Sequence, residues 1–355
     1  MSNLRYYTNL DGIRGIAALM VIVFHFFGSE SQEYLEKIDL FRQLTEFGQH
    51  GVTLFFVLSG FVITRILINT RNKTGYFSLF YLKRILRILP LYYLYLIAHY
   101  YLLPVILDKP FTNFNYQIPV YFYLQNLTEV LNIKASGPGH FWSLAVEEHF
   151  YLLWPLVVFV INPKHLSKLI AVIIIGVFFL KYYMLKNGYS INYFTFTRVD
   201  QLLMGAILAL LESNGFFKDR HALKKMLFIG LTVFPIAVIV YIFSGKFYFI
   251  KEMMKYPILG LFFFAAIGLL ISTKDKNIIN LFLTSKVLQY LGKISYGLYV
   301  WHIFALRIVE KFLLTKMWII DMFLEISLSI FLAHLSFFLF EKYFLELKNR
   351  IRLKS

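Results

Sequence analysis

Apolar stretches separated by short polar gaps run along the whole chain. Ten of them are long enough to be helices of a membrane bundle, at Ile13–Gly28, Gly51–Ile68, Ile85–Leu107, Phe141–Ile161, Leu169–Leu185, Val199–Leu211, Met226–Phe243, Tyr256–Ile271, Ser295–Leu314 and Ile319–Phe340. A spanning helix needs about 20 apolar residues, and several of the ten approach this length, although the sixth is short. No linker or internal repeat divides the chain. The pattern predicts an all-α integral membrane protein, a bundle of about ten transmembrane helices in a single domain over residues 1–355.

Composition agrees with this fold class and narrows the function. The chain is 59% hydrophobic and only 16% charged, whereas a typical soluble domain has about 25% charged residues. The net charge of +16 does not indicate a nucleic acid partner, because the basic residues lie in the gaps between apolar runs, where the positive-inside rule places them. The absence of cysteine excludes disulfides, thiolate nucleophiles and cysteine metal sites. We expect no metal cofactor.

The distribution of charge predicts the orientation of the bundle. An even number of spans places both termini on one side, and with that side in the cytoplasm the inner segments hold more Lys and Arg than the outer ones. The gap after the second segment is basic and the gap before it is acidic, with Arg65, Arg71, Lys73, Lys83, Arg84 and Arg87 in the first and Glu30, Glu33, Glu36, Asp39 and Glu46 in the second. We expect cytoplasmic termini and external segments at 29–50 and 108–140. Neither segment is large enough for a catalytic domain, so any chemistry belongs to the bundle.

Two ionisable side chains lie within the first apolar segment. Arg14 and His25 are eleven residues apart, which is about three helical turns, so they share one helix face about 16 Å apart. An ionisable group at this depth normally faces a bundle interior or an aqueous path. Arg14 alone can snorkel to the headgroups or pair with Asp11, and His25 alone can be an ordinary hydrogen-bonded histidine. Together they indicate a site in which His25 is a general base.

Two adjacent carboxylates occur in the segment FWSLAVEEHFYLLWP, at Glu147 and Glu148. One carboxylate near a helix start can complement the helix dipole, but two followed by His149 exceed that need. They point about 100° apart, so at most one of them shares a face with a given partner. Glu147 lies four residues after Ser143 and therefore on the same side. This favours Glu147 for the site, with Glu148 as the second choice.

A cluster of basic residues, Lys83, Arg84 and Arg87, lies at the predicted cytoplasmic entrance of the third segment. Basic residues at such a boundary commonly contact lipid headgroups and set topology. The alternative is an anionic cofactor such as a phosphate-bearing nucleotide tail, because Arg84 and Arg87 lie three residues apart on one face and can both grip phosphate oxygens. The residues alone favour the headgroup role.

Two further polar positions have ordinary structural explanations. Arg198 and Asp200 lie at the outer end of the short sixth segment, where an ion pair between them is expected. His302 lies about two turns into the ninth segment. We expect it to hydrogen-bond to a neighbouring helix.

These motifs, taken in order, resemble those of acyltransferase family 3, the integral-membrane acyltransferases that O-acetylate bacterial surface glycans. Seven pieces carry the resemblance: LDGIRGIAALMVIVFHF, FFVLSGFVITRIL, RILRILPLYY, FWSLAVEEHFYLLWP, FTRVDQLLMGAILA, SYGLYVWH and FEKYF. The family's pattern of Arg, ten residues and His falls on Arg14 and His25. Its WSL-x-VEE pattern falls on Trp142, Ser143, Leu144, Val146, Glu147 and Glu148, whereas Ala145 and His149 depart from the residues common in the family.

The resemblance implies an O-acetyltransferase of the bacterial inner membrane. Its substrates would be cytoplasmic acetyl-CoA and a hydroxyl of an envelope carbohydrate, such as O-antigen, capsule or another surface polysaccharide. Arg84, Arg87 and Arg14 would then hold acetyl-CoA, and His25 would be the general base, oriented by an acidic partner such as Glu147, or the acyl carrier. We expect no appended soluble esterase-like domain. A membrane transporter or flippase for a glycan or small solute is the alternative, since transporters also bury charges and interrupt helices.

Overall fold

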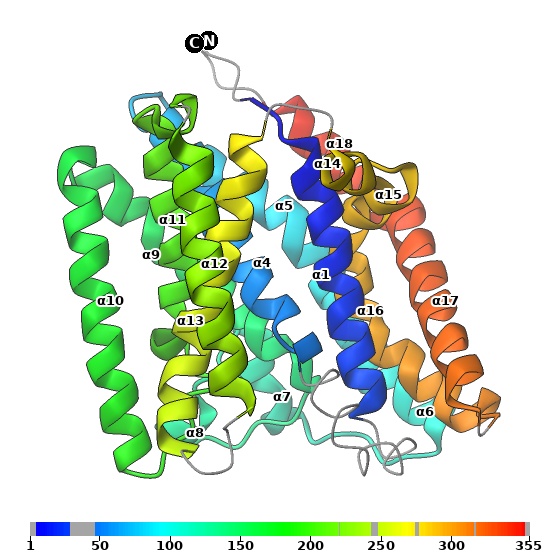
Figure 1. The fold of residues 1–355 in the computed structure, drawn as a ribbon. Helices are drawn as coiled ribbons and strands as arrows, with labels where there is room; N and C mark the ends of the chain where they lie inside the picture. The colour runs from blue at the N-terminus through cyan, green and yellow to red at the C-terminus, as the bar shows by residue number, and fades with distance from the viewer. Residues whose placement is uncertain are drawn as a thin grey trace.

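The protein is an all-helical bundle (Figure 1). The computed structural model describes residues 5–28, 47–219, 221–242, 248–273, 277–315 and 317–351, and no strand occurs among them. The all-α prediction is therefore confirmed. The first predicted external segment, 29–50, lies outside the described residues except at its last four positions.

Long helices run from one end of the bundle to the other, and short helices lie at its two ends (Figure 1). The long ones are α1 (Thr8–Phe27), α4 (Gly51–Thr70), α5 (Tyr76–Ile97), α9 (Trp142–Val160), α10 (Pro163–Lys186), α11 (Thr195–Ser213), α12 (His221–Ile242), α13 (Tyr248–Ser272), α16 (Ser295–Ile308) and α17 (Trp318–Ser336). The shorter ones are α6 (Leu103–Leu107), α7 (Phe114–Tyr121), α8 (Thr128–Leu131), α14 (Ile278–Leu283), α15 (Lys286–Lys293) and α18 (Lys342–Arg350). Short π-helical or 3₁₀ turns connect several of them: η2 (Ala98–Leu102), η3 (Gly139–Phe141), η4 (Phe216–Lys218), η5 (Val309–Leu313) and η6 (Phe337–Glu341). We call the end at which α1 begins and α18 lies the terminal end, and the end with α7 and α8 the far end.

Eight helical stretches among the described residues are long and apolar enough to cross a membrane. They are α1, α4, α5 to α6, η3 to α9, α10, α12, α13 and α17 to α18. The sixth and ninth predicted segments form helices in the same bundle, α11 and α16 with η5, but their composition is more polar. Arg198, Asp200 and Glu212 interrupt the first, and Arg307, Glu310 and Lys311 interrupt the second.

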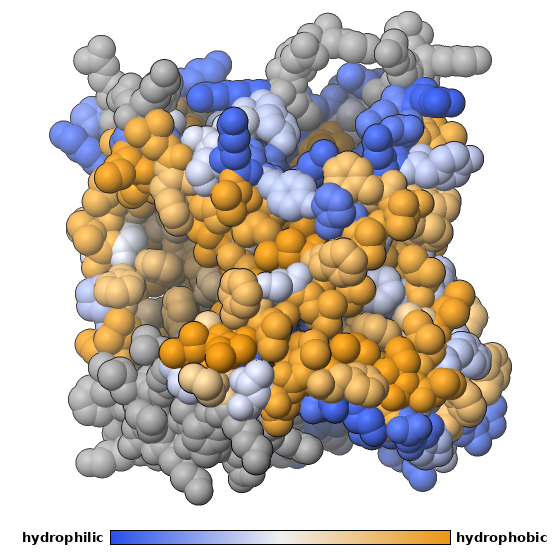
Figure 2. Space-filling view, turned by 90° about the vertical axis from the view of Figure 1, so that its right-hand side faces the viewer, coloured by the Kyte–Doolittle hydropathy of each residue, from blue (hydrophilic) through white to orange (hydrophobic). Residues whose placement is uncertain are grey.

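The surface of the bundle carries an apolar belt. On the face that carries α17, hydrophobic residues cover the middle of the molecule, and hydrophilic residues gather above and below (Figure 2). Large apolar side chains are exposed on other helices too, among them Ile97, Leu152, Phe179 and Phe228. A soluble protein would not expose so many, whereas a bilayer covers them. The chain is a multi-pass membrane protein.

The third helix begins earlier than its apolar pattern predicts. α5 starts at Tyr76, well before Ile85, so Arg84 and Arg87 lie inside the helix rather than at its entrance. The Tyr76 hydroxyl donates to the Pro155 carbonyl oxygen at 3.0 Å, which ties the added turns to α9. Because Arg84 and Arg87 belong to a regular helix packed in the bundle, their side chains have a fixed direction toward its interior.

α11 is held in the bundle by close contact with α4. A Cβ atom at Gly205 of α11 would lie 2.0 Å from the Val57 carbonyl oxygen, and one at Gly60 of α4 would lie 1.8 Å from the Leu202 carbonyl oxygen. Only glycine allows the two backbones to approach this closely, as is common between helices in membranes. This contact places α11, despite its charges, against a helix that lines the site described below.

The glycine contact generates a prediction about stability. Gly205→Ala would insert a methyl group against a backbone oxygen, which cannot move aside as a flexible side chain can, so we expect destabilisation of at least about 1–3 kcal/mol. The matched control is Gly176→Ala in α10, where a Cβ atom meets nothing within 4 Å. Thermal unfolding of the purified protein in detergent should show a lower midpoint for Gly205→Ala alone. Equal midpoints for the two variants would contradict the close contact.

Candidate functional site

A charged pocket lies between five helices in the half of the bundle nearer the terminal end. We call it the arginine pocket. α1, α4, α5, α9 and α16 line it, and its polar side chains are Arg14, Ser59, Arg84, Arg87, Ser143, Glu147, Glu148, Tyr151, Ser295, Tyr296 and Tyr299. Such a concentration of charge inside an apolar bundle is the usual mark of a substrate or ion path.

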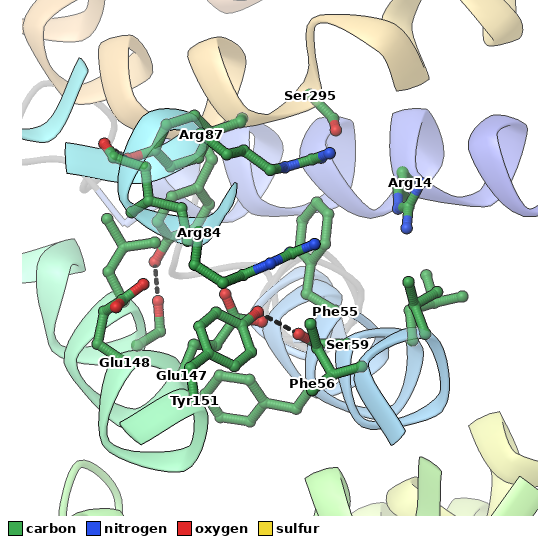
Figure 3. Close-up of a pocket in the computed structure, with 18 of the residues that line it drawn as sticks. Arg14, Phe55, Phe56, Ser59, Arg84, Arg87, Glu147, Glu148, Tyr151 and Ser295 are labelled. Atoms are coloured by element: carbon green, nitrogen blue, oxygen red, sulfur yellow. Dashed lines mark hydrogen bonds between the residues drawn. The ribbon is translucent and has the colours of Figure 1, made fainter. Parts of the chain in front are cut away.

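Three guanidinium groups meet in this pocket. Arg84 and Arg87 extend from α5 toward the side on which Arg14 projects from α1 (Figure 3). Arg14 pairs with Asp11 at 2.7 Å, as the i, i+3 spacing predicts. Arg84 packs over the Tyr151 ring, and its Nε has no hydrogen-bond partner among the described residues. The pocket therefore has unused donors suited to an anionic ligand.

Both glutamates of the WSLAVEE segment face this pocket. Glu147 lies against Ser59 of α4 and Tyr151 of α9, whose hydroxyl groups are hydrogen-bonded to each other (Figure 3). Glu148 also lines the pocket, on the side of α9 away from Ser59. Two carboxylates and three guanidinium groups thus share one enclosure, and neither glutamate is a surface charge.

A second and larger cavity lies nearer the far end. We call it the histidine cavity. Its volume is about 630 Å³, and its lining includes Gln125, Asn126, His25, His140, Trp142, Asn192, Tyr193, Arg198, Tyr256 and Tyr299. Val52 and Tyr299 line both the cavity and the arginine pocket, so they form a common wall.

Three histidines from different elements cluster beside this cavity. The ring centroids of His25 and His302 are 4.9 Å apart, and those of His140 and His302 are 4.8 Å apart. His302 Nε2 lies 3.2 Å from His25 Nδ1, which also lies 2.9 Å from the Val21 carbonyl oxygen. No group of three His, Asp or Glu side chains among the described residues is arranged to hold a metal ion. The cluster is a hydrogen-bonded pair with a third ring packed against it.

The common wall is hydrogen-bonded. The Tyr299 hydroxyl donates to the His140 carbonyl oxygen at 2.6 Å and lies 2.5 Å from Ser143 Oγ. These contacts join α16 to the start of α9 and hold the Tyr299 ring in place between the pocket and the cavity.

The structure distributes the residues singled out from sequence over these two spaces. Arg14, Arg84, Arg87, Ser143, Glu147 and Glu148 line the arginine pocket, and His25, Trp142 and Arg198 line the histidine cavity. The expected contact between His25 and Glu147 is not present, because they lie in different spaces. The partner of His25 is His302, which does hydrogen-bond to a neighbouring helix as expected.

The expected ion pair between Arg198 and Asp200 is also absent. Asp200 pairs instead with Lys181 of α10 at 2.5 Å, and Lys181 is fully buried. Arg198 lies over the ring of Tyr256, with its Cζ 3.5 Å from the ring centroid. Residues i and i+2 point to different sides of a helix, so each finds a partner on a different neighbour.

Several residues of the site were missed in the sequence. Lys181 lies in an otherwise apolar segment, and that isolated charge was a signal that it is paired inside the bundle. His140 precedes the WSL motif by two residues, and Tyr299 precedes His302 by three on the same helix face. His140 is a neighbour of His25 and Tyr299 belongs to the common wall only because of the way in which α9, α16 and α1 pack together.

The fold and the site define a multi-pass helical bundle that encloses a pocket of guanidinium and carboxylate groups next to a histidine-lined cavity. A family model described as "Acyltransferase domain" matches residues 7–342. The chain belongs to this family, acyltransferase family 3, which confirms the resemblance.

Named relatives agree with the family. The chain is 30% identical to "Putative O-acetyltransferase SACOL0978" of Staphylococcus aureus strain COL, over 94% of this chain and 56% of the relative. It is 27% identical to "O-acetyltransferase OatA" of Staphylococcus aureus strain NCTC 8325, over 84% of this chain and 50% of the relative. The chain thus spans about half the length of these curated relatives. No solved structure matches it.

The buried pair of Lys181 and Asp200 generates a prediction about stability. Asp200→Leu would leave an ammonium group unpaired in the bundle, a loss of about 3–5 kcal/mol. The double variant Lys181→Met with Asp200→Leu removes both charges and should recover most of this loss. The measurement is the thermal unfolding midpoint in detergent. Similar midpoints for the single and double variants would show that an unpaired Lys181 is not the cause of the destabilisation.

Proposed function

We propose that this chain is a membrane O-acetyltransferase that moves an acetyl group from acetyl-CoA to a hydroxyl of a cell-envelope carbohydrate. The observation that carries the proposal is the pair of adjoining spaces with different chemistry. The arginine pocket suits an anionic donor, the histidine cavity contains a base, and Val52 and Tyr299 are common to both. The family and the names of the relatives support the same reaction class.

Orientation follows from charge. The terminal end of the bundle carries the basic gap after α4, and the positive-inside rule places such a gap in the cytoplasm. The termini are then cytoplasmic, α11 and α16 bring the number of spans to about ten, and the protein lies in the bacterial inner membrane as a single domain over residues 1–355. The arginine pocket faces the compartment that contains acetyl-CoA, and the histidine cavity faces the compartment of the envelope glycan.

The donor is held by charge. Acetyl-CoA carries phosphate groups, and arginine binds phosphate through planar, charge-assisted hydrogen bonds. Arg84 and Arg87 lie on one helix and Arg14 faces them from α1, with Arg84 Nε lacking a partner among the described residues. This arrangement supports the anion-binding reading of these arginines over the headgroup reading. Their charge would bind CoA and leave its thioester near the common wall.

The protons of the histidine pair can be assigned from their partners. His302 Nδ1 lies 2.6 Å from the Tyr299 carbonyl oxygen, which only accepts, so Nδ1 carries the proton and Nε2 is an acceptor. His25 Nδ1 faces two acceptors, the Val21 carbonyl oxygen and His302 Nε2, so it is the donor. His25 Nε2 is then unprotonated and can take a proton.

The chemical step uses this nitrogen. The acceptor hydroxyl oxygen attacks the thioester carbonyl carbon, its proton moves to His25 Nε2, the carbon–sulfur bond breaks, and CoA leaves as a thiolate. The same nitrogen lone pair would form an acyl-histidine if the acetyl group passed through the enzyme first. In both cases His302 positions His25 by accepting from its Nδ1–H. Glu147 and Glu148 line the arginine pocket, which is the donor side of the common wall.

Removal of the base tests the proposal. We expect His25→Ala to lower acetyl transfer by about 10²–10⁴-fold, or more if His25 carries the acyl group. His302→Phe should also lower the rate, by less, because the ring of His25 loses its acceptor but keeps its Nε2. The matched control is His334→Ala, an exposed histidine of α17 outside both spaces.

The variants are compared at matched membrane levels, in cells that lack the native gene. The readouts are CoA thiol release from acetyl-CoA by isolated membranes and the base-labile O-acetyl signal of envelope glycans by NMR. Near-normal activity of His25→Ala would refute the proposed mechanism. Movement of a solute without any acetyl transfer would indicate a transporter instead.

The donor site gives a second prediction. Arg84→Gln with Arg87→Gln should raise the KM for acetyl-CoA more than that for the glycan, and the difference should shrink at high salt because screening already weakens the wild-type interaction. The matched control is Lys73→Gln with Lys83→Gln, which removes two charges near the same end from residues that do not line the pocket. If the two double variants have equal effects, Arg84 and Arg87 contribute to membrane topology and do not bind the donor.

A further inference from the structure

Arg198 is a buried cation that forms no ion pair with any of the described residues. Its side chain is 2% exposed and lines the histidine cavity. Nε and Nη1 have no hydrogen-bond partner among the described residues, and Nη2 has one long contact, 3.5 Å to Thr53 Oγ1. A buried charge normally has its donors satisfied, since an unpaired one is costly. Arg198 therefore has donors available for a ligand.

The carboxylates near this position are engaged elsewhere. Asp200 pairs with Lys181 at 2.5 Å. Glu252 of α13 pairs with Lys255 at 2.7 Å, and Glu129 of the cavity lining accepts from the Ser190 backbone N–H at 3.0 Å. In the part of the chain that the structure describes, no ion pair involves Arg198.

Aromatic rings hold the guanidinium group by its face. Its Cζ lies 3.5 Å from the ring centroid of Tyr256, 5.2 Å from that of Trp142 and 5.7 Å from that of Phe56. Cation–π contact compensates part of the buried charge and fixes the plane of the group. The N–H donors lie in that plane and not along the stacking direction, so the rings leave them available. This is an arginine held ready for an anion rather than one bound in an ion pair.

The cavity has the size and lining of a small-molecule site. Its volume of about 630 Å³ lies in the range of about 300–1,000 Å³ typical of such sites. Asn126, Asn192 and Tyr193 add amide and hydroxyl groups to the aromatic lining. Because His25 and Arg198 line the same cavity, a ligand bound at one is within the same enclosure as the other.

We propose that the histidine cavity binds an acidic sugar, whose anionic oxygens pair with Arg198 while a hydroxyl of the same molecule faces His25. This rests on the proposed function and specifies its acceptor: a glycan unit that carries a carboxylate or phosphate group. Arg198 is a specificity-determining residue, because a neutral sugar would leave its donors unpaired, and a site with unpaired buried polar groups rejects the analogue that lacks the partner.

The test measures binding, so it does not depend on catalysis. Purified protein in nanodiscs is titrated with glucuronate, glucose 6-phosphate and glucose, and binding is followed by tryptophan fluorescence, to which Trp142 contributes, and by the thermal unfolding midpoint. We expect at least one of the two acidic sugars to bind about 10- to 100-fold more tightly than glucose, as for a charged hydrogen bond. The acidic sugar that binds more tightly identifies carboxylate or phosphate as the recognised group.

Variants assign the preference to Arg198. Arg198→Gln should abolish it, and Arg198→Lys should retain part of it, because lysine keeps the charge but not the planar donors. Lys134→Gln, an exposed charge next to the cavity-lining Ala135, should leave the preference unchanged. If Arg198→Gln fails to fold, the comparison of acidic and neutral sugars in the wild-type protein still tests whether the cavity prefers an acidic sugar. Equal binding of the three sugars, or a preference that persists in Arg198→Gln, would overturn the inference. Acetyl transfer to a neutral glycan, with no preference for acidic sugars, would also overturn the inference, but it would leave the proposed function intact.

Discussion

Burial of charge within an apolar bundle is the constraint on which the rest of this structure depends. A single charge in hydrocarbon costs several kcal/mol, so a helix can carry one only where a partner or a polar cavity meets it. α11 illustrates the solution. Its Asp200 pairs with Lys181 of α10, its Glu212 pairs with Arg65 of α4, and its glycine contact with α4 holds it in register. A helix more polar than the eight apolar spans is thereby kept within the bundle.

The remaining charges collect where no helix compensates them fully. Arg84 and Arg87 share the arginine pocket with Glu147 and Glu148, and Arg198 lines the histidine cavity without an ion pair among the described residues. The ion pairs of Asp200 with Lys181 and of Glu212 with Arg65 connect neighbouring helices, whereas the charged groups of the pocket and the cavity border open volume. That difference, more than the number of charges, separates the residues of the site from those that hold the bundle together.

The sequence predicts what depends on one helix and fails where two helices must be placed together. The apolar pattern predicts the helices, and the i, i+3 spacing correctly predicts the pair of Arg14 and Asp11. The start of α5 is missed because its first turns are stabilised by contact with α9. The partner of Asp200 is Lys181 and that of His25 is His302, which no spacing within one segment can reveal. Glu147 was expected beside His25 because of its depth and its place in the WSLAVEE segment, but the contact depends on how α9 packs against α1 and α16.

The common wall constrains the group that the protein can transfer. If the donor is bound in the arginine pocket and the acceptor in the histidine cavity, the acyl group must pass the common wall, to which Val52 and Tyr299 belong. Both residues are buried, and the Tyr299 hydroxyl is held by the His140 carbonyl oxygen and by Ser143. A ring fixed in this way cannot swing aside without losing those hydrogen bonds, and a buried unpaired hydroxyl costs about 1–3 kcal/mol. On the proposed route, a two-carbon acetyl group would displace this wall less than a longer acyl group would.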